Sequence, residues 1–109
     1  MISLTTVAAG MSAVAEQRKE NGADIKTDTL SLLKHCATEV VEATEAYTRC
    51  EWDDDNNPSH TFELFEGELA DIVACVLIIA HREGIDMEEA LTKCMAKNKR
   101  RADGEGDKK

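Results

Sequence analysis

The sequence has very few proline and aromatic residues. Pro58 is the single proline among 109 residues, and the aromatic residues are Trp52, Tyr47, Phe62 and Phe65. Proline in a helix interior removes a hydrogen bond and kinks the helix, so its scarcity favours long, uninterrupted helices. Hydrophobic residues make up 42% of the chain, and most of them are Leu, Ile, Val, Ala and Met, which suit the core of a helical bundle. These features predict an all-α fold.

The sequence also lacks long apolar runs and an excess of basic residues. No stretch of about 18 apolar residues is present, so we expect no membrane span, and the N-terminus does not resemble a signal peptide. Thirteen basic and 22 acidic side chains give a net charge of −9. Nucleic acids and anionic membranes both require a basic face, so we expect neither as a partner. An acidic protein still binds nucleotides when metal ions bridge to the phosphates.

None of the four cysteines forms a Cys-x-x-Cys pair; they are Cys36, Cys50, Cys75 and Cys94. Zinc sites usually require such closely spaced ligands. The even number would allow two disulfides, but nothing else in the sequence suggests secretion. We therefore expect free thiols in a reducing, cytoplasmic environment.

Four helices are predicted, at about residues 3–20, 28–49, 60–83 and 86–101. Apolar residues recur at helical spacing in these segments. Asp86, with Glu89 three residues later, is typical of a helix start, and Gly22 and Gly84 stand where helices would end. Residues 1–101 are expected to form a single four-helix bundle, and 102–109 a flexible charged tail.

Two acid pairs occur on successive helices: Glu39 with Glu42, and Glu68 with Asp71. Residues three apart lie on one face of a helix, and both pairs sit among apolar residues. One such pair alone is commonly a solvated face. If the two helices pack antiparallel, however, the four carboxylates converge, and like charges at close range need compensation. Mg²⁺, or Mn²⁺ as an alternative, is the ion that such oxygen ligands favour.

Taken in order, the motifs resemble the MazG-like all-α nucleoside triphosphate pyrophosphohydrolases over roughly residues 28–101. The first motif is Glu39-Val-Val-Glu42 and the second is Glu68-Leu-Ala-Asp71; Gly84-Ile-Asp86 and Lys97-Asn98-x-x-Arg101 follow. Thr38 stands where many members carry a further Glu, which removes one potential general base. Residues 1–101 would then be a single MazG-like helical domain.

The resemblance implies an enzyme that hydrolyses nucleoside triphosphates, deoxynucleoside triphosphates in particular, between the α and β phosphates. Glu39, Glu42, Glu68 and Asp71 would hold the metal, and Glu39 or Glu42 would also orient the attacking water. The implied role is house-cleaning of the nucleotide pool by a homodimer or a dimer of dimers. Two alternatives stay open: a phosphoribosyl-ATP pyrophosphohydrolase-like enzyme, and a non-catalytic helical interaction protein.

Substrate contacts are predicted at three places in addition to the acids. Lys97 and Arg101 lie one turn apart, and the resemblance implies that they bind phosphates together with Asn98; a basic helix end would otherwise only complement the helix dipole. Trp52 either stacks on the base or plugs the end of the bundle. His35, one turn before Glu39, is either a substrate contact or an ordinary surface histidine.

Overall fold

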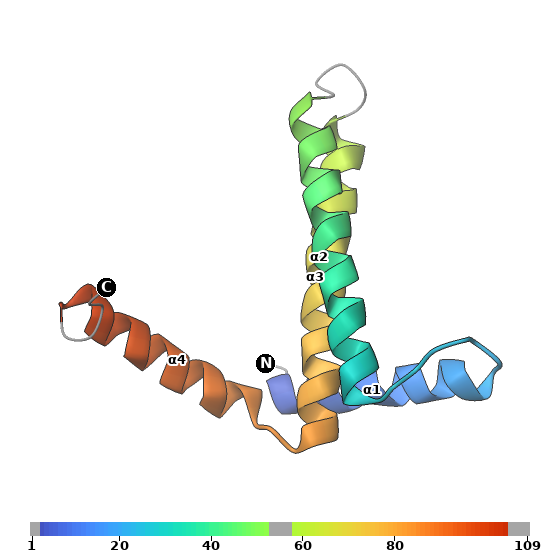
Figure 1. Ribbon diagram of the computed structural model, residues 1–109, viewed down its shortest axis with the longest axis horizontal. Helices are drawn as coiled ribbons and strands as arrows, with labels where there is room; N and C mark the ends of the chain where they lie inside the picture. The colour runs from blue at the N-terminus through green and yellow to red at the C-terminus, as the bar shows by residue number, and fades with distance from the viewer. Residues whose placement is uncertain (1–2, 53–57, 105–109) are drawn as a thin grey trace.

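The computed structural model describes the backbone of residues 3–52 and 58–104 and the side chains of residues 3–49 and 63–104. Within these ranges all the regular structure is helical, which confirms the predicted all-α class. The helices are α1 (Leu4–Glu20), α2 (Thr29–Trp52), α3 (Pro58–Glu83) and α4 (Met87–Ala102) (Figure 1). Their bounds lie close to the predicted ones. Residues 105–109 of the predicted tail lie outside the described part of the chain.

The connection between α2 and α3 is shorter than the polar segment 50–60 suggested. α2 continues to Trp52 and α3 already begins at Pro58. Proline is well suited to the first position of a helix, because the N–H that it lacks would have no acceptor there. Residues 53–57 lie outside the described ranges.

Local capping explains where the helices begin. Ser3 accepts a hydrogen bond from the backbone N–H of Thr6, and Asp86 accepts hydrogen bonds from the N–H groups of Glu88 and Glu89. Such side chains satisfy N–H groups that have no partner inside the helix. Gly84, which follows α3, has φ +70°, a conformation that favours glycine. These ends were expected from the sequence, because each depends on neighbouring residues only.

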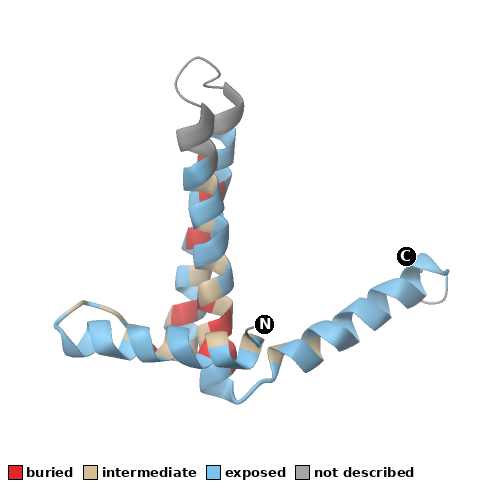
Figure 2. Ribbon diagram, turned by 180° about the vertical axis from the view of Figure 1, so that it is seen from behind, coloured by how far each residue is buried: buried red, intermediate tan, exposed pale blue. Residues whose placement is uncertain are grey.

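An antiparallel hairpin of α2 and α3 forms the body of the molecule, and α1 lies across one end of it (Figure 1). Buried residues line the seam of the hairpin and its crossing with α1 (Figure 2). Most of them are small, which allows the helix backbones to approach closely. The buried hydrophobic residues of the described part are Ala8, Leu32, Ala43, Ala46, Cys75, Leu77 and Ala80.

The apolar second half of α3, Ile72 to Ala80, contributes much of this core. Cys75, Leu77 and Ala80 are buried, whereas Val73 is 54% exposed. Despite this apolar stretch, no helix in the described ranges is long and apolar enough to cross a membrane.

α4 extends away from the hairpin and packs mainly against α1 (Figure 1). The carboxylate of Glu88 accepts a hydrogen bond of 2.6 Å from the N–H of Leu4 at the start of α1. α4 has no buried residue, and its apolar side chains Leu91 and Met95 are exposed. The Cα radius of gyration is 17.1 Å, whereas a compact chain of this length has about 13 Å. The four predicted helices are present, but one chain alone does not close them into a compact bundle.

Candidate metal centre

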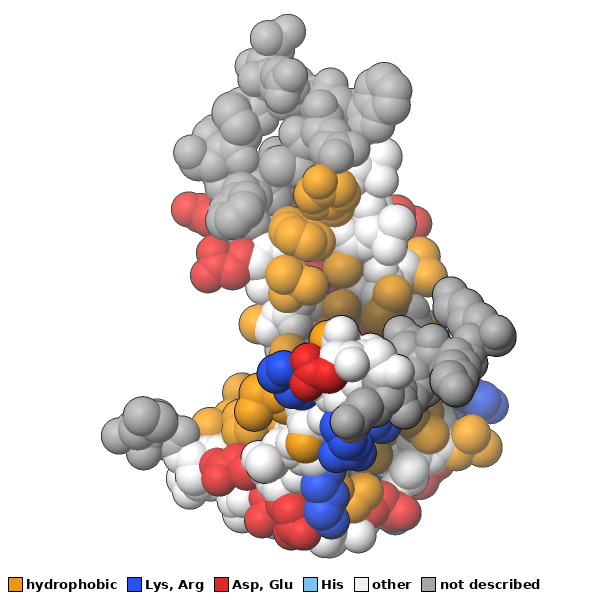
Figure 3. Space-filling view, turned by 90° about the vertical axis from the view of Figure 1, so that its left-hand side faces the viewer, with side chains coloured by type: hydrophobic (Ala, Val, Ile, Leu, Met, Phe, Trp, Pro, Cys, Tyr) orange, Lys and Arg blue, Asp and Glu red, His pale blue; other side chains and the backbone are white. Residues whose placement is uncertain are grey.

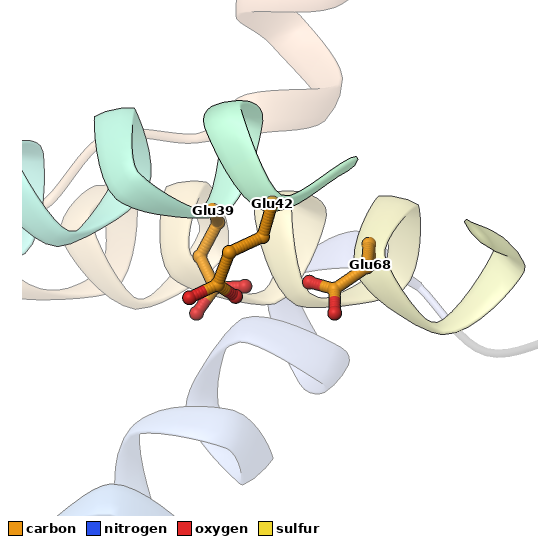
Figure 4. Close-up of side chains that lie close together, drawn as sticks. All are labelled: Glu39, Glu42 and Glu68. Atoms are coloured by element: carbon orange, nitrogen blue, oxygen red, sulfur yellow. The ribbon is translucent and has the colours of Figure 1, made fainter. Parts of the chain in front are cut away.

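Three carboxylates converge on one side of the hairpin. Glu39 and Glu42 come from α2 and Glu68 comes from α3, and each offers an oxygen within 4.8 Å of the others (Figure 4). The antiparallel packing of α2 on α3 produces this meeting, because it sets the middle of one helix opposite the first half of the other. The predicted convergence of the acid motifs is therefore present for these three residues.

Glu39 is the most enclosed of the three, with 8% of its surface exposed. Burial is the main reason why the pKa of Glu39 lies above its ordinary value of 4.5, and the negative charge of Glu42 is the next cause. The adjacent carboxyl of Glu68 raises this pKa further. His35 acts in the opposite direction, because its Nε2 lies 2.9 Å from Oε1 of Glu39. The cluster thus holds negative charge at a place where it is poorly solvated.

The donor set fits a hard divalent cation. Oε2 of Glu39 and Oε2 of Glu68 are buried and have no hydrogen-bond partner among the described residues. A buried acceptor without a partner is costly, and a bound cation would remove that cost. Since the donors are all carboxylate oxygens, Mg²⁺ or Mn²⁺ suits them better than ions that prefer nitrogen or sulfur.

Asp71 is close to this cluster but does not belong to the compact group of three. Its charge contributes to the raised pKa of Glu39, and both side chains line the same cavity. Asp71 is exposed, so it faces solvent more than Glu39 does. Its role as a fourth ligand stays a prediction.

A cavity of about 560 Å³ adjoins the carboxylates, within the size range of small-molecule sites. Glu39 and Asp71 stand on its α2 and α3 walls, and α1 with the connection 21–28 forms a third wall. Arg18 and Lys26 lie on this third wall. Neither residue was predicted as a site residue from the sequence, because neither belongs to a recognised motif.

The other predicted site residues lie in different parts of the molecule. His35 lines the cavity beside Glu39. Lys97, Asn98 and Arg101 are exposed on α4, which does not contribute to the lining of the cavity. Figure 3 shows Lys and Arg side chains gathered over α4, which points toward the viewer. Trp52 is the last residue of α2, and its side chain lies outside the described part. Substrate contact by these residues stays a prediction.

Fold and site together define an all-α protein with a cluster of carboxylates between two antiparallel helices that could hold a cation. The family model for the MazG nucleotide pyrophosphohydrolase domain matches residues 27–104, and the chain belongs to this family. The match includes both acid motifs and the helices α2, α3 and α4, whereas α1 lies outside it. Comparisons with curated proteins and with solved structures found no match. Family membership supports a nucleotide pyrophosphohydrolase activity and agrees with a divalent metal at the acid cluster.

Proposed function

We propose that the protein hydrolyses nucleoside triphosphates, deoxynucleoside triphosphates in particular, to the monophosphate and pyrophosphate. The reaction would depend on Mg²⁺, with Mn²⁺ as an alternative. One observation carries the proposal: Glu39, Glu42 and Glu68 converge beside the cavity, and two of their buried oxygens have no partner among the described residues. The family of the chain is consistent with this chemistry.

Each residue has a definite task in this reaction. Glu39, Glu42 and Glu68 would hold the cation, with Asp71 of α3 as the proposed fourth ligand. Bound Mg²⁺ supplies neutralisation of phosphate charge and activation of a bound water. His35 holds the Glu39 carboxylate in one orientation through its 2.9 Å contact. The carboxylate of Glu39 or Glu42 would also accept the proton of the attacking water.

The proposal is tested by identifying the products from a panel of nucleoside and deoxynucleoside triphosphates, with phosphoribosyl-ATP included. Monophosphate and pyrophosphate are expected for at least one deoxynucleotide, and the panel also reveals the base preference. Glu39→Gln, Glu42→Gln and Glu68→Gln should each abolish turnover, whereas Glu45→Gln, on the exposed side of α2, should not. Turnover of phosphoribosyl-ATP alone would favour the first alternative. If the folded protein turns over none of these substrates with Mg²⁺ or Mn²⁺, a non-catalytic interaction protein is favoured.

We further propose that the protein acts as a homodimer or a dimer of dimers. The hairpin exposes Val40, Val41, Leu69 and Val73 at about half of their surface, and Figure 3 shows a column of hydrophobic side chains on the hairpin. The accessible surface is 8275 Å², whereas a compact monomer of this mass has about 6,000 Å². The accessible surface in excess of a compact monomer is therefore larger than the roughly 800 Å² that one partner buries in a standard interface.

Oligomerisation bears directly on the substrate site. Because α4 of the same chain does not line the cavity, phosphate contact by Lys97, Asn98 and Arg101 requires a second copy. Sedimentation equilibrium at micromolar concentration should give at least twice the monomer mass of 12.0 kDa. A mass near 12 kDa would contradict the dimer and, with it, the contribution of α4.

We assign the activity to house-cleaning of the nucleotide pool in the cytoplasm. Cys36, Cys75 and Cys94 are free thiols, as a reducing compartment would keep them. Residues 1–101 act as one domain in this proposal, because α1 packs across α3 and supplies a wall of the cavity.

A further inference from the structure

The wall formed by α1 and the connection 21–28 gives the cavity a cationic side. Arg18 lies in the last turn of α1. The chain reverses after α1 through Gly22, at φ +94°, and the N–H of Ala23 donates to the carbonyl of Arg18 at 3.0 Å. The connection then runs back toward α2, and the burial of Thr27 anchors it. This course places Lys26 on the same cavity as Arg18.

Neither cation is neutralised within the described part of the protein. No ion pair or side-chain hydrogen bond involves Arg18 or Lys26 in residues 3–49 and 63–104. By contrast, Lys93 and Lys99 on α4 are paired with acids of their own helix. Arg18 and Lys26 share the α1 wall with the acid Asp24, so the two unpaired cations leave this wall with an excess of positive charge in a chain whose net charge is −9.

The cavity therefore offers both kinds of group that a metal–polyphosphate ligand needs: carboxylates for the cation and basic side chains for the phosphates. Glu39 and Asp71, on the α2 and α3 walls, attract a cation but repel phosphate. Arg18 and Lys26, on the wall formed by α1 and the connection, attract phosphate oxygens, and a guanidinium binds them with two parallel hydrogen bonds. Asp24 also lines this wall and moderates its charge, while Ile25 and Ile78 supply apolar surface between the charged groups.

We infer that Arg18 and Lys26 form an anion subsite that binds the β- and γ-phosphates, which leave as pyrophosphate. This inference rests on the proposed hydrolysis, because these two phosphates carry most of the negative charge of the triphosphate and become the departing group. Both residues lie outside the segment 27–104 that the family model matches. The subsite is thus a contribution of α1 and the connection of this particular chain.

The subsite is tested with Arg18→Gln, Lys26→Gln and the double variant, and with Lys19→Gln as the matched control. Lys19 is exposed on the same helix and does not line the cavity. All three substituted positions are exposed, so circular dichroism should show unchanged folding. The measurements are calorimetric binding of inorganic pyrophosphate in the presence of Mg²⁺, and KM for the best nucleotide.

The double variant is expected to weaken pyrophosphate binding and to raise KM by ten-fold or more, with smaller effects in the single variants. Arg18→Lys should recover part of the affinity, because the charge is kept. Unchanged pyrophosphate affinity in the double variant would overturn the inference, as would equal losses in Lys19→Gln or the absence of pyrophosphate binding by the parent protein. If the parent binds pyrophosphate through these residues but hydrolyses no nucleotide, the subsite stands and the hydrolase proposal fails.

Discussion

Replacing Glu39 by Gln should make the metal-free protein more stable while removing its response to Mg²⁺. Glu39, Glu42 and Glu68 offer oxygens within 4.8 Å of one another. Two unit charges at that distance repel by about 3 kcal/mol at an effective dielectric constant near 20. Because Glu42 is exposed, solvent screening reduces the benefit of removing the charge of Glu39 to about 1 kcal/mol. For a domain of this size, that corresponds to a rise in Tm of about 4–8 °C.

The response to metal separates this effect from a general change in stability. A cation at one hundred times its Kd stabilises the folded parent protein by about 2.7 kcal/mol. Glu39→Gln should lose most of that gain, so the order of the two melting temperatures should reverse between EDTA and saturating Mg²⁺. Thermal unfolding followed by circular dichroism measures both conditions, with Glu45→Gln as the control.

The same residue gives the metal-free protein a pH dependence of known sign. Because the pKa of Glu39 is raised in the folded state, chiefly by burial, the folded protein binds this proton more tightly than the unfolded chain does. The resulting stability is fully present below the ordinary pKa of 4.5 and is lost as the pH rises through the raised value. The Glu39→Gln variant should lack this pH-dependent part of the folding stability.

Two outcomes would contradict the predictions for Glu39. One is a variant that melts below the parent protein in EDTA at neutral pH. The other is equal stabilisation of both proteins by Mg²⁺.

Four further predictions concern other parts of the molecule. Burial, together with the neighbouring thiol of Cys36, raises the pKa of Cys75 to about 11, so at pH 8 its thiolate fraction is about a hundred-fold below that of an ordinary cysteine. Mass mapping after thiol labelling should find the exposed Cys94 modified before Cys75, and equal labelling of the two would contradict the burial of Cys75. Leu77→Ala, at a buried position of α3, should destabilise the fold by about 2–5 kcal/mol in urea unfolding; a loss below 1 kcal/mol would show that the hairpin seam is loosely packed. Val73→Glu should shift the sedimentation mass toward 12.0 kDa, because it places a charge on the exposed apolar face, and an unchanged mass would locate the interface elsewhere. Trp52→Ala should raise KM for the best nucleotide about ten-fold with little change in kcat. Base stacking contributes about 1–3 kcal/mol and stabilises the bound substrate and the transition state equally. A lower Tm with an unchanged KM would instead identify Trp52 as a structural plug.

The sequence determined the helices and the acid motifs, because both depend on interactions over a few residues. Ser3 and Asp86 cap helices through N–H groups two or three positions away, and apolar spacing predicted where the helices run. The three-residue spacing of Glu39 and Glu42 guaranteed a common face on α2. Since a short connection makes successive helices antiparallel neighbours, the approach of Glu68 to that face was also predictable.

Only the tertiary structure decided what surrounds the acid cluster. In the hairpin, Asp71 lies outside the compact group of three carboxylates, which the three-residue spacing of Glu68 and Asp71 did not predict. α1 crosses the hairpin and brings Arg18 to the cavity, while α4 carries Lys97 away from it within one chain. The positions of α1 and α4 depend on contacts between residues far apart in the sequence. The free energy of these contacts arises from the burial of whole helix faces. A local pattern specifies which face of a helix is apolar, but not which other helix covers it.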